Sequence, residues 1–109
     1  MFTRIKDYYR SNGSSLQSGV TIVPSRVVDL FGSPDDSDGY KVSMEWLFED
    51  EEGNVVTLYD WKSTSLYEEG LPSPVSVINS VHPLHLHVGA HDYQTAVKFV
   101  DWLLLQGEE

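Results

Sequence analysis

The chain contains no cysteine among its 109 residues. That absence excludes disulfides, iron–sulfur clusters, thiolate zinc sites and cysteine nucleophiles. Basic residues are also scarce, because 7 lysines and arginines stand against 17 acidic residues, which gives a formal net charge of -10. We therefore do not expect a protein that binds nucleic acid or an anionic membrane through a basic surface.

Long apolar runs are missing as well. No stretch approaches the roughly 20 apolar residues that a membrane-spanning helix needs. Arg4, Lys6 and Asp7 interrupt the N-terminus where a signal peptide would need an apolar segment. We therefore expect a cytoplasmic protein. Hydrophobic residues make up 40% of the chain, which is sufficient for the core of one domain over residues 1–109.

The first third of the chain predicts helix and loop. Apolar residues recur at helical spacing over residues 2–9, which favours a short helix or an ordered arm. Residues 11–19 are rich in serine and glycine, so residues 1–19 are expected to form a flexible arm and linker. A short helix follows, with Pro24 in its first turn and Gly32 at its C-terminal cap.

Strand patterns dominate the middle of the chain. Apolar and polar residues alternate over residues 40–50, and residues 55–62 are rich in β-formers. The intervening turn makes these two segments a hairpin. Residues 84–89 predict a third strand. Residues 63–81 read as a long loop that contains a short strand at 75–78.

A final helix is expected after the capping residue Asp92. Its predicted core stripe consists of Ala96, Val97, Val100, Leu103 and Leu104. Three further residues, Phe99, Trp102 and Leu105, widen that stripe. They either pack on the hairpin, which we favour, or form a homodimer seam. The pattern predicts an α+β fold, with a small, mainly antiparallel sheet of three to four strands, the C-terminal helix on one face and a short N-terminal helix.

The hairpin register decides which side chains share a face. A turn centred on Glu52–Gly53 places Trp46 opposite Tyr59 and Glu45 opposite Asp60, with Lys62 diagonal to the two acids. Opposed carboxylates repel one another. Either Lys62 or a divalent metal would compensate. A shift by one residue would bury one of the two acids.

The stretch MEWLFEDEEGNVVTLYDWKST, residues 44–64, resembles the central hairpin of PD-(D/E)xK nucleases of the RecB-like branch. In that family an acid on one strand and a D-x-K on the next hold a divalent metal and activate water. The resemblance implies that Glu45, Asp60 and Lys62 bind Mg²⁺ and catalyse hydrolysis. The other interpretation is a solvated strand face with one salt bridge.

A second resemblance covers more of the chain. A short helix that ends in FGSP, an aromatic hairpin, and a later strand and helix are similar to small virus-encoded accessory and inhibitor proteins. The helix and hairpin also resemble the β-lactamase-inhibitor-like module of lipoprotein assembly factors. Both groups bind partners and catalyse no reaction, so this resemblance implies a binding protein.

The acidic residues are concentrated in one segment. Residues 29–69 alone carry a net charge of -10. Acidic loops can merely keep a protein soluble, or they can mimic a phosphate backbone and attract a basic or nucleic-acid-binding protein. The leading hypothesis is a non-enzymatic inhibitor of a host defence factor that needs no cofactor. Its contact surface would centre on Asp35, Asp36, Asp38, Glu49, Asp50, Glu51 and Glu52.

Four histidines lie within ten residues, and they suggest a third function. They are His82, His85, His87 and His91. Two or three of them could hold Zn²⁺ or contact a nucleotide, although half-buried structural histidines would give the same pattern. Together with the loop 63–81, they would line a pocket of a protein that sequesters a small ligand, across a dimer. The nearby acids should raise the histidine pKa values.

Overall fold

The computed structural model describes residues 1–36 and 39–106. It has an α+β fold, as the sequence predicts, with a five-stranded sheet in which every neighbouring pair is antiparallel. The sheet is therefore one strand larger than the three to four expected. Its strands, in spatial order, are β1 (Thr3–Ile5), β3 (Glu45–Glu49), β4 (Val55–Tyr59), β5 (Leu84–Ala90) and β2 (Ser15–Ile22).

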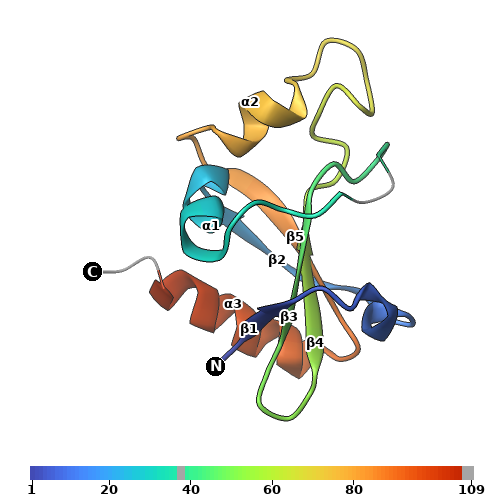
Figure 1. Cartoon of the computed structure of the whole chain (residues 1–109), viewed down its shortest axis with the longest axis vertical. Helices are drawn as coiled ribbons and strands as arrows, with labels where there is room; N and C mark the ends of the chain where they lie inside the picture. Colours follow the sequence, from blue (N-terminus) through green and yellow to red (C-terminus); the bar gives the residue numbers. More distant parts are fainter. Residues whose placement is uncertain (37–38, 107–109) are drawn as a thin grey trace.

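The helices lie on one side of this sheet. In Figure 1, α1 (Pro24–Phe31) and most of α3 (Tyr93–Gln106) lie to the left of the strands, and α2 (Pro74–Ile78) lies above α1. The short 3-10 helix η1 (Tyr8–Ser11) lies to the right. We call the side packed by α3 the core face and the other side the open face. None of the described helices is both long and apolar enough to cross a membrane.

The predicted hairpin forms, but its register differs by one residue from the expected one. Glu45 lies opposite Tyr59, and Trp46 lies opposite Leu58. The cause is a three-residue loop, closed by a hydrogen bond from the Asp50 amide to the Asn54 carbonyl, with Gly53 at φ 83°. Glycine adopts this left-handed conformation without strain, so the loop lengthens by one residue and moves the centre of pairing.

The core face confirms that the C-terminal helix packs on the sheet. Trp46, Phe48 and Leu58 are fully buried there, together with Phe99 of α3. The ring of Phe99 lies 4.9 Å from that of Phe48, so Phe99 packs within the chain and takes no part in an exposed seam. Leu104, expected in the core stripe, is 46% exposed instead. In the same helix Trp102 packs on Phe31, and Leu105 stays exposed.

The N-terminal segment agrees with the prediction only in part. The short N-terminal helix is present as the 3-10 helix η1, but the strand β1 precedes it. The serine- and glycine-rich stretch, expected as a linker, begins β2, so the N-terminal segment supplies both edge strands. Pairing with β5 outweighs the weak strand propensity of serine and glycine. The strand expected at 75–78 is wrong. That segment is the short helix α2, because the Ser73 hydroxyl caps it and Pro74 occupies its first turn.

The remaining helix predictions are confirmed. Helix α1 has Pro24 in its first turn and ends at Gly32, whose φ of 90° suits a residue without Cβ. Its Val27 side chain is buried in the same core as α3. Asp92 caps α3, because its carboxylate accepts a hydrogen bond from the Thr95 amide at 2.7 Å.

Candidate ligand-binding site

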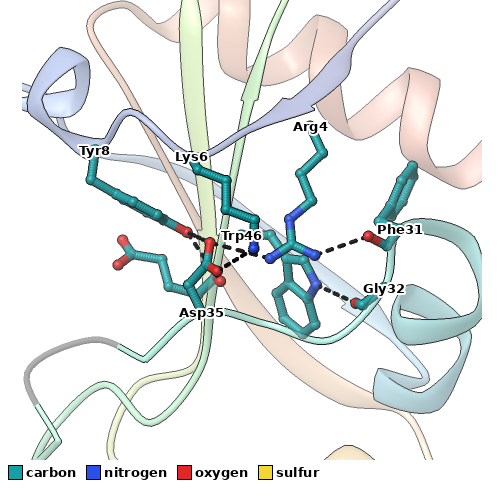
Figure 2. A network of polar contacts seen from close by, with 8 residues as sticks. Arg4, Lys6, Tyr8, Phe31, Gly32, Asp35 and Trp46 are labelled. Carbon is teal, nitrogen blue, oxygen red and sulfur yellow. Dashed lines mark hydrogen bonds and ion pairs between the residues drawn. The ribbon is translucent and has the colours of Figure 1, made fainter.

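Asp35, one of the predicted contact acids, is held by partners within the chain. Lys6 and Tyr8 each donate a hydrogen bond to it at 2.7 Å, and Arg4 forms an ion pair with it at 3.2 Å (Figure 2). Burial raises the pKa of Asp35, but these three contacts outweigh that effect and hold it below its ordinary value. Arg4 also donates to the Phe31 carbonyl. The network therefore fastens β1 to the end of α1.

The acids around the hairpin turn have partners too. Glu49 forms an ion pair with Arg10 at 2.6 Å, and Glu51 lies 3.0 Å from the terminal amine. Asp50 accepts hydrogen bonds from the amides of Glu52 and Asn54, which stabilises the turn. Binding through an acidic surface stays a prediction.

The predicted contact acids that the structure describes do not form one cluster. Asp36 and Glu52 are exposed, and Asp38 lies outside the described residues. An isolated backbone β-bridge joins Asp35 to Glu45, the first residue of β3. The hairpin turn lies at the other end of that strand. The predicted contact residues thus occupy two separate places.

The three residues that the nuclease resemblance implies as catalytic do not come together. With the observed register, Glu45 lies on the open face beside Tyr59, whereas the Asp60 carboxylate is fully buried. It accepts hydrogen bonds from the Ser43 amide at 2.7 Å, the Met44 amide at 3.0 Å and the Ser63 hydroxyl at 2.5 Å. The Lys62 ammonium lies 5.7 Å from the centre of the Trp61 ring. Asp60 therefore fastens neighbouring loops together, and Glu45 does not lie opposite it.

The four histidines separate into a pair and two single residues. His85 and His87 project from the same face of β5, with ring centres 5.5 Å apart. His91 instead lies 3.1 Å from the Arg10 carbonyl, and His82 lies before the start of β5. Within residues 1–36 and 39–106, no group of three histidine or acidic side chains converges on a position suited to a metal ion.

An aromatic cluster, defined here as Tyr59, Trp61 and His87, stands on the open face. The His87 ring stacks on Tyr59 at 5.7 Å with an angle of 23°, and the edge of Trp61 faces it at 6.5 Å. Trp61 is 44% exposed, and neighbouring Leu16 is 56% exposed. Exposed apolar side chains that adjoin one another in this way are unusual outside binding sites.

Shallow hollows surround the aromatic cluster. One of about 270 Å³ is lined by the cluster itself and Leu16. A second, of about 260 Å³, extends from Tyr59 and Trp61 over Gly89 to the residues that follow η1. A third reaches His85 and Gly19. All three hollows have Leu16 in their lining, so they adjoin one another around this side chain on the open face. We call the three together the depression.

Two titratable groups in this depression have shifted pKa values. Burial, followed by the neighbouring His85, lowers the pKa of His87, against a weaker opposing effect of Asp60. The expectation that acids raise the histidine pKa values is therefore wrong for His87. Burial, followed by the charge of Glu45, raises the pKa of Tyr59. Neutral forms of both groups are favoured, so the depression holds them as hydrogen-bonding groups without charge. Such shifts occur frequently in functional sites.

The sequence predicted part of this site. The alternation in residues 84–89 correctly places His85 and His87 on one face. Tyr59 was missed because the expected register assigned it to the core face. Gly19 and Gly89, each within a strand, were the neglected signal, since glycine inside a strand often marks a close approach of another group.

Comparison with known proteins adds no relative. No protein-family model matches the chain, and no curated protein matches it either.

Proposed function

We propose that the protein is a non-enzymatic binding protein that holds a small molecule in the depression on the open face. The observation that carries this proposal is the aromatic cluster of Tyr59, Trp61 and His87, which lies partly exposed around adjoining hollows. A pocket that combines apolar rings with a few polar groups and shifted pKa values is the usual form of a ligand site.

This proposal takes precedence over the acidic-surface inhibitor. Asp35, Glu49 and Glu51 form ion pairs within the chain, so their charges are partly neutralised before any partner arrives. The open-face residues, in contrast, present rings and hydroxyl groups to solvent. A cytoplasmic location belongs to the proposal, because a cysteine-free chain suits a reducing compartment.

Titration with a library of neutral planar fragments, observed by NMR, tests the proposal. We expect the indole N–H signal of Trp61 and the amide signals around His87 to shift. The indole signal of Trp46 should stay in place, because Trp46 is fully buried and hydrogen-bonded to Gly32. The variant Trp61→Ala should abolish the shifts at His87. Tyr93→Ala is the matched control, since Tyr93 is 62% exposed but lies on α3.

The opposite pattern would refute the proposal. Fragments that shift signals only outside the open face would place the binding site elsewhere. Binding that survives in Trp61→Ala would show that the aromatic cluster is not the site.

A further inference from the structure

We infer that the ligand is an uncharged nucleoside-like molecule, in which a planar heteroaromatic ring is joined to a group that carries several hydroxyls and no phosphate. This inference rests on the proposed function and narrows it. It comes from the arrangement of the depression, which has an aromatic end, a hydroxyl-rich end and a lining without cationic side chains.

The aromatic end fits a planar ring. Tyr59 and His87 already form a stack, and the Trp61 ring stands at 64° to His87. Rings of this kind bind heteroaromatic bases by stacking, and a neutral imidazole can also donate or accept a hydrogen bond at the edge of a base. Leu16 closes this end of the depression with an apolar side chain.

The other end fits hydroxyl groups. Ser11, Ser14, Ser15 and Thr57 line it together with Glu45. The Ser11 hydroxyl donates to the Tyr8 carbonyl, so its oxygen can accept from a ligand. The Ser15 oxygen accepts from Gln17, so its proton can be donated. A carboxylate such as that of Glu45 is a strong acceptor for sugar hydroxyls.

Gly89 lies in the lining between the two ends. A Cβ at this position would lie 2.6 Å from the Thr57 hydroxyl oxygen and 3.5 Å from a Tyr59 ring carbon. The absence of a side chain at Gly89 therefore leaves room for Thr57 and Tyr59 to pack against β5, which places the Thr57 hydroxyl beside the aromatic end.

The charges around the depression disfavour phosphate. Among the residues that the structure describes, no lysine or arginine lines the three hollows, whereas Glu45 does. Lys41 and Lys62 lie 5.8 and 5.7 Å from the centre of the Trp61 ring, outside that lining. Phosphate recognition normally needs cationic donors in direct contact, and the net charge of -10 adds repulsion.

Isothermal titration calorimetry with adenosine, guanosine, cytidine and uridine, and with their 5′-monophosphates, tests this inference. We expect at least one nucleoside to bind, and its monophosphate to bind about tenfold or more weakly because of the Glu45 charge. Glu45→Gln should reduce that difference by about threefold or more. Trp61→Ala should abolish nucleoside binding, and Tyr93→Ala should leave it unchanged.

Each remaining outcome counts against the inference. A monophosphate that binds as tightly as its nucleoside would overturn the inference of an uncharged ligand. It would indicate that Lys41 and Lys62 neutralise the charge of the phosphate. If no nucleoside binds while neutral planar fragments still shift the Trp61 signal, the ligand class is wrong and the proposed function stands. If neither nucleosides nor fragments bind at Trp61, both proposals fail.

Discussion

The two faces of the sheet are formed by the same strands, but one face is buried and the other is partly exposed to solvent. On the core face, Trp46 is fully buried and donates a hydrogen bond to the Gly32 carbonyl at 3.0 Å. On the open face, Trp61 is 44% exposed and lies beside a depression. Strand alternation places neighbouring side chains on opposite faces of the sheet. Trp61 follows the end of β4 by two residues and lines the depression together with Tyr59. The packing of α1 and α3 closes the core face, and this difference separates the residues that stabilise the fold from those available to a ligand.

Two carboxylates repeat the same contrast at one end of the hairpin. Asp60 is fully buried and accepts three hydrogen bonds, so it acts as a structural group. Glu45, one register position away, lines the open-face depression and faces Tyr59 across the hairpin. The observed register therefore separates two acids that the nuclease resemblance placed in one site. Asp60 lies in the core, and Glu45 lines the depression.

Matched tryptophan variants should show the largest difference between the faces. Trp46→Ala should lower the free energy of unfolding by about 3–5 kcal/mol, because it leaves a large cavity in a closed core. Trp61→Ala should change it far less, since much of its ring already contacts solvent. Urea unfolding followed by circular dichroism measures both effects. Equal losses for the two variants would show that the open face is as closed as the core.

Matched carboxylate variants should give the next largest effect. Asp60→Ala should cost about 2–4 kcal/mol, because it leaves the Ser43 and Met44 amides without an acceptor. Glu52→Gln, a change at an exposed carboxylate of the hairpin turn, should leave the unfolding free energy nearly unchanged. The same urea experiment applies. A nuclease built on Asp60 and Glu45 would instead lose Mg²⁺-dependent cleavage in Asp60→Asn, and cleavage activity of the parent protein would contradict the structural role of Asp60.

The hairpin shows how far the sequence can predict this molecule. Alternation and β-forming residues correctly predicted the hairpin of β3 and β4, although both strands are shorter than the expected 40–50 and 55–62. The register depended on whether Gly53 sits in a two- or three-residue loop, and both loops suit glycine. That single choice moved Tyr59 from the predicted core to the site and buried Asp60.

The N-terminal segment shows where local patterns fail. Serine and glycine in β2 carry little strand propensity, so only long-range pairing with β5 makes this segment a strand. The depression combines residues from η1 and from β2, β3, β4 and β5. No local sequence pattern predicts that these separate segments come together, although the pair His85 and His87 was visible in the sequence.

Two glycine variants test how rigid the open face is. Gly89→Ala should cost about 1–3 kcal/mol, because the new Cβ would meet the oxygen of buried Thr57 at 2.6 Å. Gly19→Ala should cost less, since its nearest neighbour is the ring of exposed His85, which can rotate away. Thermal unfolding compares the two. A larger loss for Gly19→Ala would show that the His85 ring is fixed as firmly as Thr57.

The smallest expected effect is the pH dependence contributed by His87. Its pKa in the folded protein lies below the ordinary value of 6.5, first because of burial and second because of His85. Between pH 6.5 and the lower pKa of the folded state, the unfolded chain binds more protons than the folded one. The stability therefore falls as the pH drops from about 6.5 through the folded pKa.

The loss of stability expected from Asp35 begins only below its ordinary pKa of 3.8, so the contributions of His87 and Asp35 are separable. His87→Phe keeps a ring against Tyr59 and should reduce the loss of stability below about pH 6.5, measured as the urea midpoint. Leu105→Phe, which changes an exposed residue of α3 that does not titrate, is the control and should leave the slope as in the parent protein. An unchanged slope in His87→Phe would mean that the open face imposes no cost on a charged His87, and the contrast with the closed core would then rest on packing alone.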